Sequence, residues 1–230
     1  MSPVQISVRH QPSFAVVRVD LAPGEQVRGE SGSMAAHSWG VQVEAQMQGG
    51  FMKSLGRSVL GGESMFVTTF RAHPEHPGWV DLAAQLPGDA LVLDVTPSMP
   101  VVLTRGSWLA SGPRVELDTK FGGTAATFGG EGAFVVRASG EGPVVAACYG
   151  ALDRHDLPEG GGFTVDAGHV VGYEERVQPA MRKVTTGIMS TLKSGEGWVF
   201  DFRGPGTVWT QSRNPKELVA WLTRMLPSRG

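Results

Sequence analysis

Short runs with alternating apolar and polar residues recur along most of the chain. In residues 41–47, Val, Val, Ala and Met alternate with Gln, Glu and Gln, and residues 14–21 show a similar period of two. Side chains with this spacing point to opposite faces of a β-strand. Apolar runs at 91–95, 101–103 and 115–118 are separated by Gly, Pro and Ser clusters. The pattern therefore predicts many short strands joined by tight turns.

Three stretches of the sequence are nearly alike. Each has glycine and glutamate before an apolar run, then a second glycine-rich turn and a second apolar run. The shared pairs, 65 to 68 residues apart, are Gly62-Glu63, Gly130-Glu131 and Gly195-Glu196. Recurrence at a nearly fixed spacing indicates internal repeats. We predict a hairpin used three times, with the Gly-Glu pairs as structural turns, in one compact unit with repeats at about 1–86, 87–157 and 158–212.

A second marker supports the same division. A turn of proline, glycine and an acidic residue occurs in three places, which are Pro23-Gly24-Glu25, Pro87-Gly88-Asp89 and Pro158-Glu159-Gly160. Gly32 and Gly168 each follow the turn glycine by eight residues, whereas Gly106 follows Gly88 by eighteen. On this alignment the middle repeat carries about ten extra residues.

Only the end of the chain predicts a clear helix, over residues 214–226. Asn214 can cap it, Pro215 suits its first turn, and Glu217 favours the positive end of the helix dipole. One apolar face follows at helical spacing, formed by Leu218, Trp221, Leu222, Met225 and Leu226. We expect this face to cover an open end of the β core rather than to bind a partner.

Two apolar segments lack the period of a strand and precede equivalent turns. They run from Phe51 to Leu60 and from Ile188 to Leu192, and both contain methionine, whose side chain adapts to changing contacts. We predict that they meet a second copy or a partner rather than the core, with a membrane surface as an alternative. The predicted interaction face consists of Phe51, Met52, Leu55, Ile188, Met189 and Leu192.

Composition favours a β-rich intracellular protein. The 230 residues include 32 glycines and 15 prolines, too dense for long helices. The net charge is −2 with scattered basic residues, which argues against nucleic acid as a partner. The single cysteine, Cys148, excludes an internal disulfide and is expected to be a buried strand thiol. The chain shows no leader pattern and no apolar run of 18 residues, so we expect a cytoplasmic protein without a transmembrane segment.

Few residues offer chemistry. His73, Glu75 and His76 form the best local set of metal ligands, but they lie in a proline-flanked loop without a helix to align the rings. Loop decoration is therefore the favoured interpretation, and a metal site the open alternative. Glu63, Glu131 and Glu196 are interpreted as turn residues rather than as a carboxylate site. We predict no catalytic residue, no cofactor and no metal.

Longer motifs carry a family resemblance over residues 14–213. They are the turn formed by Leu21, Pro23, Gly24 and Glu25, the stretch Gly61–Phe66, the stretch Val165–Val171 and, most specific, Phe202–Arg213. Together they resemble the bacterial branch of a family of unknown function whose eukaryotic relatives are mitochondrial-biogenesis (altered inheritance of mitochondria) proteins. That family is classed as TRAP-like, after the tryptophan RNA-binding attenuation protein.

The resemblance implies an all-β fold of three tandem TRAP-like or double-stranded β-helix-type sandwich modules with a C-terminal helix. It also implies a homotrimer and no known catalytic residue. Attenuation proteins bind tryptophan between modules and RNA on basic edges, but this chain has only five lysines and no repeated basic triplet.

The function predicted from sequence is a non-enzymatic assembly or scaffold protein that acts through self-association and an unknown protein partner, with peripheral membrane contact or a stress role as extensions. The first alternative is a small-ligand or RNA binder of attenuation-protein type. The second is a metal-dependent enzyme that uses His73, Glu75 and His76.

Overall fold

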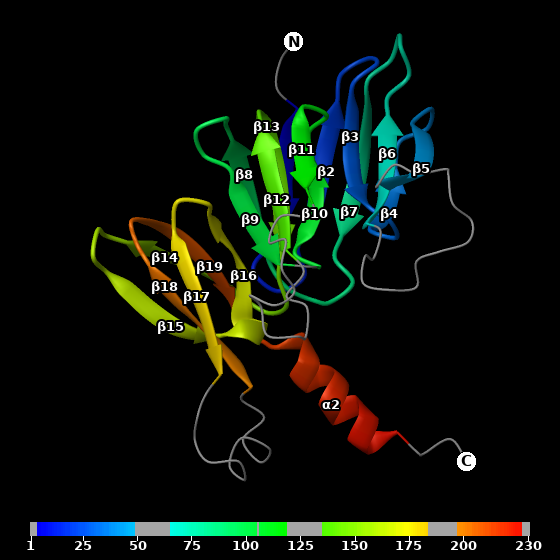
Figure 1. Ribbon diagram of the computed structural model, residues 1–230. Helices are drawn as coiled ribbons and strands as arrows, with labels where there is room; N and C mark the ends of the chain where they lie inside the picture. Colours follow the sequence, from blue (N-terminus) through cyan, green and yellow to red (C-terminus); the bar gives the residue numbers. More distant parts are fainter. Residues whose placement is uncertain (1–3, 49–64, 105, 119–134, 184–196, 227–230) are drawn as a thin grey trace, which may run out of the picture.

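The computed structural model describes residues 4–48, 65–104, 106–118, 135–183 and 197–226 (Figure 1). Within these ranges the chain forms nineteen β-strands, one short 3₁₀ helix and one α-helix at its C-terminal end. The all-β class and the C-terminal helix predicted from the sequence are therefore confirmed.

The strands fall into three successive groups of six, preceded by β1 (Gln5–Arg9). The first group is β2 (Val16–Leu21), β3 (Gln26–Glu30), β4 (Met34–His37), β5 (Gln42–Gln48), β6 (Met65–Arg71) and β7 (Gly78–Ala83). The second is β8 (Ala90–Val95), β9 (Val101–Thr104), β10 (Trp108–Ser111), β11 (Val115–Asp118), β12 (Val135–Gly140) and β13 (Gly142–Ala147). The third is β14 (Leu152–Leu157), β15 (Gly162–Asp166), β16 (Val170–Glu174), β17 (Gln178–Lys183), β18 (Trp198–Arg203) and β19 (Gly206–Gln211). The 3₁₀ helix η1 (Ala167–His169) precedes β16, and α2 (Pro215–Met225) follows β19.

Every group pairs its strands by the same scheme. The sixth strand lies between the first and the third, as in β2-β7-β4, β8-β13-β10 and β14-β19-β16. The fifth lies between the second and the fourth, as in β3-β6-β5, β9-β12-β11 and β15-β18-β17. All of these pairs are antiparallel. Each group thus contributes two half-sheets of three strands.

Neighbouring groups are joined edge to edge. Strand β10 of the second group pairs with β3 of the first, and β16 of the third pairs with β9 of the second. Four sheets result, here called sheets I to IV. Sheet I is β1-β2-β7-β4, sheet II is β5-β6-β3-β10-β13-β8, sheet III is β11-β12-β9-β16-β19-β14 and sheet IV is β15-β18-β17.

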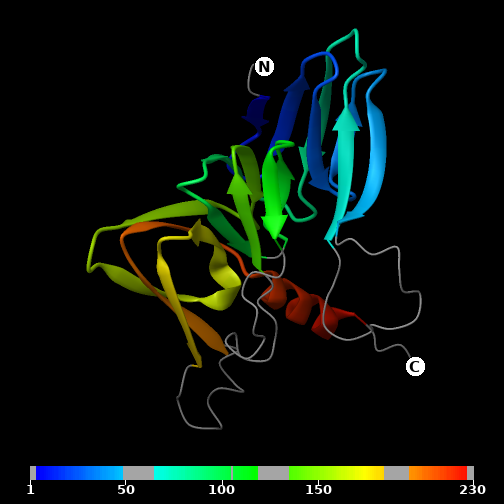
Figure 2. The same ribbon diagram turned by 45° about the horizontal axis from the view of Figure 1, so that its top comes forward.

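Three hydrophobic cores lie between successive sheets, so the sheets are stacked in the order I to IV (Figures 1 and 2). Leu82 of sheet I and Leu109 of sheet II both belong to the first core, and Trp108 and Trp209 belong to the second. Phe202 of sheet IV packs in the third. Sheets II and III therefore have a core on each face, which explains why strands such as β10 and β19 are buried along their whole length.

The predicted hairpin is wrong. The strands before and after its second turn, such as β12 and β13, do not pair with each other but belong to sheets III and II. Gly140 and Gly142, with φ of 94° and 136°, form the corner at which the chain crosses between these sheets. Alternation along a strand indicates which face is buried, but not which other strand lies beside it, so the sequence could not distinguish a corner from a hairpin.

The marker turns are equivalent only in part. Gly24, between β2 and β3, and Gly160, between β14 and β15, share a φ of 72° to 74°. Gly24 and Gly160 lie between the first and second strands of their groups, but the turn at Pro87–Asp89 precedes β8, the first strand of the second group. The equivalent connection in the second group, between β8 and β9, is formed by residues 96–100. Gly106 follows Ser98, in this connection, by eight residues, so the middle group needs no insertion of ten residues. Pairing also places β14, which precedes the predicted boundary at 158, with the third group.

Helix α2 forms as predicted but does not cover the core. The side chain of Asn214 accepts a hydrogen bond from the Lys216 amide at 2.9 Å, as expected for an N-cap. No residue of the helix is buried, and Trp221 and Met225 are 52% and 68% exposed. Figure 1 shows α2 leading away from the sheets. The expectation that its apolar face covers an open end of the β core is therefore wrong for the described residues.

Candidate functional site

All residues of the predicted interaction face lie outside the described residues, and so do the three Gly-Glu pairs. Nothing is therefore concluded about Phe51, Met52, Leu55, Ile188, Met189 and Leu192, or about the Gly62, Gly130 and Gly195 turns. The strands that lead into and out of these segments are described. They form the antiparallel pairs β5–β6, β11–β12 and β17–β18, one in each group. In Figures 1 and 2 the starts of β6, β12 and β18 lie on the side toward which α2 projects.

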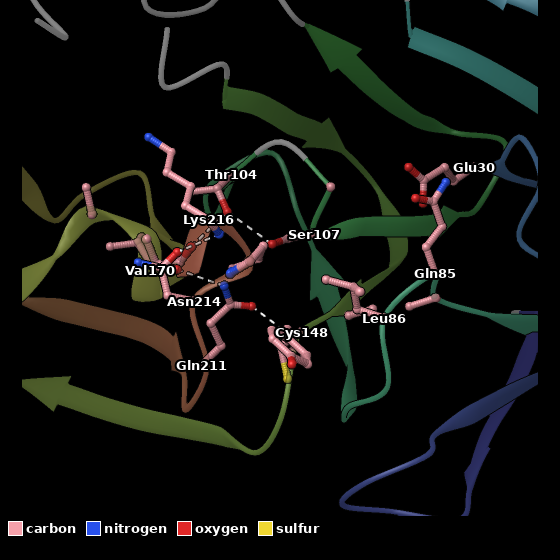
Figure 3. A pocket seen from close by; sticks show the side chains of 17 residues that line it. Glu30, Gln85, Leu86, Thr104, Ser107, Cys148, Val170, Gln211, Asn214 and Lys216 are labelled. Carbon is pink, nitrogen blue, oxygen red and sulfur yellow. Dashed lines mark hydrogen bonds between the residues drawn. The ribbon is translucent and has the colours of Figure 1, made fainter. Parts of the chain in front are cut away.

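A cavity of about 330 Å³ lies where all three strand groups meet (Figure 3). The second strand of each group and the turn that follows it contribute Glu30, Thr104 with Ser107, and Gly168. The ends of the sixth strands and the segments that follow them complete the wall with Gln85, Leu86, Cys148, Tyr149, Gln211 and Asn214. The cavity also includes the start of α2, through Pro215 and Lys216.

Hydrogen bonds within the wall use most of its polar groups. Thr104 Oγ1 donates to the Val170 carbonyl at 2.8 Å, and Gln211 Nε2 donates to the Gly168 carbonyl at 2.9 Å. Gln211 Oε1 in turn accepts from the Tyr149 amide at 2.8 Å. The Thr104–Val170 and Tyr149–Gln211 bonds join the second group to the third, and the Gln211–Gly168 bond lies within the third.

Two charged side chains of the cavity wall form no hydrogen bond with the described residues. Among the described residues the Glu30 carboxylate has no hydrogen-bond partner, and burial raises the pKa of Glu30 above its ordinary value. The Lys216 ammonium likewise has no partner in the described part of the chain, and Figure 3 shows it across the cavity from Glu30. Cys148 is buried, which raises the pKa of its thiol to about 11, so the thiol is protonated at neutral pH and unreactive.

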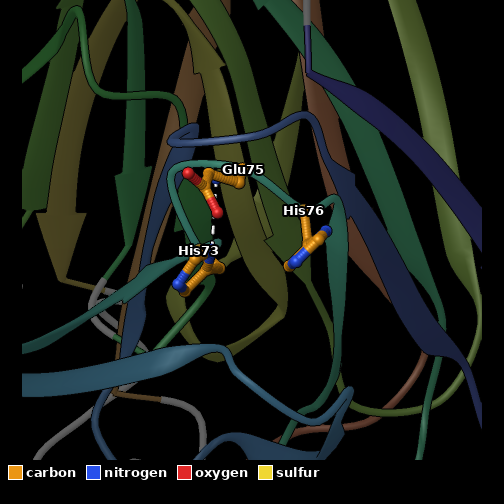
Figure 4. A group of neighbouring side chains, drawn as sticks. All are labelled: His73, Glu75 and His76. Atoms are coloured by element: carbon orange, nitrogen blue, oxygen red, sulfur yellow. Dashed lines mark hydrogen bonds between the residues drawn. The ribbon is translucent and has the colours of Figure 1, made fainter.

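The structure brings His73, Glu75 and His76 together on the connection between β6 and β7 (Figure 4). One potential ligand atom from each lies within 4.8 Å of the others, and all three side chains are exposed. His73 Nδ1 accepts a hydrogen bond from the Glu75 amide at 3.1 Å, which in the neutral ring places the proton on Nε2. The two rings stack at 5.2 Å. The cluster thus combines three exposed potential ligand atoms with a hydrogen bond inside the loop, and the choice between loop decoration and a metal site stays a prediction.

Two strand edges form a further candidate site. Strand β4 pairs on one side only, with β7, and all four of its residues are exposed. Strand β15 pairs on one side only, with β18. The residue pairs of the described strands include no second neighbour for either strand, although β10, β16, β3 and β9 each have two. Met34 is 42% exposed, and Trp39, just after β4, is fully exposed at 101%. Sequence patterns missed this site because an edge is defined by the absence of a neighbour.

Comparison with known proteins identifies the family. Residues 6–213 match the family model for Mitochondrial biogenesis AIM24. The chain belongs to the AIM24 family. The predicted resemblance to the mitochondrial-biogenesis family is therefore confirmed.

Two bacterial proteins are similar to nearly the whole chain. An uncharacterized protein of Streptococcus pyogenes serotype M6 is 30% identical over 234 residues, which cover 98% of this chain and 92% of the relative. The X-ray crystal structure of a Streptococcus pyogenes protein matches with a TM-score of 0.75 at 27% identity, covering 97% of this chain and 100% of that one. The AIM24-family chain thus shares its fold with a solved bacterial structure.

The AIM24-family chain contains no candidate membrane span among its described helices. The described α-helix, α2, has eleven residues, and no described helix combines the length and apolarity that crossing a bilayer requires.

Proposed function

We propose that this protein is a non-enzymatic assembly protein that acts through protein–protein contacts, first of all with copies of itself as a homotrimer. The observation that carries the proposal is that β4 and β15, among the outermost strands of the four sheets, are the ones whose counterparts in the other groups (β10 and β16, β3 and β9) pair on both sides. Natural β proteins usually cover open strand edges or pair them, because unpaired backbone N–H and C=O groups attract other strands. Here the equivalent inner strands are all paired within the chain, while the two terminal ones are open.

The proposal includes a modular architecture. We infer that each group of six strands is one TRAP-like sandwich module, with module boundaries before β8 and before β14. The identical pairing scheme of the three groups supports this inference, as do the matching glycines at 24 and 160. A chain of such modules, each bound to its neighbour through one strand edge, provides two complementary ends for further association.

The predicted interaction face is part of the same proposal. The hairpin strands that lead into its two segments open on the side toward which α2 projects, and α2 presents Val219, Trp221 and Met225 to solvent. Exposed apolar groups gathered on one side favour contact with another protein. A cytoplasmic location belongs to this proposal, and peripheral membrane contact is its alternative.

Light scattering tests the self-association directly. We expect a mass of about three times the monomer mass of 24.4 kDa at micromolar concentration. A monomer mass across that range would contradict the proposal.

Serine substitution tests the interaction face. Replacing Phe51, Met52, Ile188 and Met189 should lower the oligomer mass or abolish capture of a partner while the β-sheet circular dichroism stays unchanged. Val92→Ser with Met99→Ser is the matched control, because these apolar side chains are 39% and 46% exposed on another part of the molecule. Global unfolding of the test variant would show that the segments belong to the core, and an unchanged mass and capture would remove them from the proposal.

A second candidate function, binding of a small ligand, is favoured by the cavity at the meeting point of the three groups. The carboxylate of Glu30 and the ammonium of Lys216, which have no partner among the described residues, suit a zwitterion such as an amino acid, whose own charges are opposite. Titration calorimetry with L-tryptophan should then give heat that Glu30→Gln and Lys216→Gln both weaken. Absence of heat at millimolar ligand would contradict amino-acid binding. A gel shift with pooled cellular RNA should stay negative, because the net charge is −2.

A further inference from the structure

Strand β4 is the counterpart of two strands that pair on both sides. It has the third place in its group, as β10 and β16 have in theirs, and each of these strands lies beside the sixth strand of its group. All three contain an irregularity at the same place, which falls between Met34 and Ala36, between Trp108 and Ala110, and between Val170 and Gly172. A shared irregularity fixes the alignment: Ala36 corresponds to Ala110 and Gly172.

The outer sides of β10 and β16 define the register of a junction between groups. Ala110 lies opposite Gly29 of β3, and Gly172 lies opposite Leu103 of β9. In both junctions the third-place strand contributes a small residue, Ala or Gly, at this position. The small residue lets the backbones approach, since a Cβ on Gly172 would lie 2.7 Å from the Val102 carbonyl oxygen.

Strand β15 is the counterpart of β3 and β9 in the third group. Gly29, Leu103 and Val165 each lie three residues before a glycine of the following turn, which are Gly32, Gly106 and Gly168. The residues two positions before these three also correspond to one another. Val27 and Val101 belong to hydrophobic cores, and Phe163 packs against one. Val165 therefore takes the position that Gly29 and Leu103 hold in the two existing junctions.

We propose that β4 of one copy pairs antiparallel with β15 of the next copy, with Ala36 opposite Val165 and His37 opposite Thr164. This inference rests on the proposed function and names its interface. The pairing joins sheets I and IV into one sheet in the order β17-β18-β15-β4-β7-β2-β1, which repeats the arrangement of sheets II and III. In the proposed junction the third-place strand, β4, contributes the small residue Ala36, as β10 contributes Ala110 and β16 contributes Gly172.

The occupant of the edge is a second copy because the two complementary strands are carried by the same chain and cannot meet within it. Figures 1 and 2 both show β15 and β4 in opposite parts of the molecule, and they belong to different sheets. Strand β4 contains Met, Ala, Ala and His, without the Lys, Asp, Glu or Pro that commonly protect an open edge. The exposed side chains of Met34 and Trp39 lie beside this edge, where an added strand would cover them.

Such an interface is head to tail, since one surface of each copy meets a different surface of the next. Repetition of a head-to-tail contact closes into a ring or continues as a filament. A ring of three copies would satisfy every β4 and every β15.

Disulfide trapping tests the register. In a Cys148→Ala background, the single variants Ala36→Cys and Val165→Cys are purified separately, mixed and mildly oxidised. Directly opposite strand residues have Cβ atoms about 4.5–5.5 Å apart, close enough for a disulfide after small shifts. We expect a crosslinked dimer from the mixture at a yield at least tenfold above that of either variant alone. The matched control is Ala36→Cys mixed with Thr164→Cys, whose side chains point to opposite faces of the joined sheet.

Charge variants provide a second test that requires no oxidation. His37→Lys with Thr164→Lys in one chain places like charges opposite each other at every interface and should reduce the mass to that of the monomer. His37→Glu with Thr164→Lys should keep the oligomer mass, and circular dichroism checks that both variants fold.

The outcomes separate this inference from the proposed function. An oligomer without crosslinking at the stated pair, or with equal crosslinking in the control, overturns the β4–β15 register while assembly stands. A monomeric wild-type protein overturns both. Crosslinking at the stated pair together with loss of mass in the Lys/Lys variant supports the interface.

Discussion

Strands β10 and β4 occupy the same place in the pairing scheme but differ in their surroundings. All four residues of β10 are buried, whereas all four of β4 are exposed. Strand β10 lies in sheet II, between β3 and β13 and between two cores, and β4 lies at the edge of sheet I. The comparison shows that burial of a strand in this fold depends on its neighbours more than on its own length or place in the chain.

Whole sheets show the same dependence on their neighbours as single strands do. Inner sheets II and III contact a hydrophobic core on both sides, whereas outer sheets I and IV contact one. In sheet I, Asp81 accepts hydrogen bonds from Arg18 and Arg9, each at 2.8 Å, and Arg18 lies 3.9 Å from the centroid of the Trp79 ring. In sheet IV, Asp201 pairs with Arg182. Ion pairs also occur at inner sheet III, where Arg137 lies 2.6 Å from Glu175, so the difference between inner and outer sheets lies in the number of cores that each contacts.

The largest effect is expected from truncating a leucine in an inner sheet. Leu103→Ala in sheet III should lower the free energy of unfolding by about 3–5 kcal/mol, and Leu82→Ala in sheet I by about 2–3 kcal/mol. Both side chains are fully buried at 0% exposure, so the starting burial is matched. An inner sheet held by two cores is less able to close the cavity than an outer one. Urea unfolding measures both values, and equal losses would remove this distinction.

A smaller effect is expected from adding a methyl group at an inner junction. Gly172→Ala should destabilise the protein by about 1–3 kcal/mol, because its Cβ would lie 2.6 Å from Leu103 Cδ2 and 2.7 Å from the Val102 carbonyl oxygen. Ala36→Gly, at the equivalent position of β4, should cost less than about 1 kcal/mol in the monomer. Thermal unfolding compares the two, and a harmless Gly172→Ala would show that β16 and β9 can move apart.

The ion pairs of Asp81 in sheet I should contribute to the free energy of unfolding by an amount similar to the effect of Gly172→Ala, and this contribution should depend on pH. Arg18, and then Arg9, hold the pKa of Asp81 below its ordinary value despite burial, which acts in the opposite direction. A depressed pKa stabilises the folded protein above the unfolded-state pKa, and this contribution is lost as pH falls through the folded-state pKa. Asp81→Asn should therefore cost about 1–3 kcal/mol at pH 7.

The difference between wild type and Asp81→Asn should shrink as pH falls below about 4, the ordinary value for aspartate. Chemical unfolding at a series of pH values measures it. A difference that stays constant down to pH 2 would mean that the shape of the side chain matters rather than its charge.

The smallest effect on folding is expected from α2. Trp221→Ser with Met225→Ser should change the free energy of unfolding by less than about 0.5 kcal/mol, because these side chains are 52% and 68% exposed and touch no core. Leu82→Ala is the positive control in the same assay. A loss above 1 kcal/mol in the monomer would show that the helix packs on the sheets in solution.

Much of the local structure could be predicted from the sequence. Alternation in residues 41–47 located β5, the apolar runs at 91–95 and 115–118 located β8 and β11, and Asn214 located the start of α2. Each of these signals is local, since side-chain period and capping act within a few residues. Cys148 is buried as expected, although it lies one residue after β13 rather than in a strand.

The remaining features depend on contacts that a local pattern does not encode. The glycines at 140 and 142 indicate a turn, but only the positions of β10 and β11 determine that the chain changes sheets there. The apolar face of α2 resembles that of a packed helix, yet it is exposed. The cavity gathers Glu30, Thr104 and Gln211 from three separate parts of the chain, and no spacing in the sequence connects them.

The sharing of sheets between successive groups also has a consequence during synthesis. Strand β3 leaves the ribosome about 80 residues before β10, its partner across the junction, so its edge stays open for on the order of ten seconds at ordinary elongation rates. For β9 and β16 the wait is similar, at about 70 residues. If β4 pairs with a second copy, its wait is set by the concentration of finished chains rather than by the ribosome. In a cell that makes little of this protein, the β4 edge would therefore be the last to close and the longest available to chaperones.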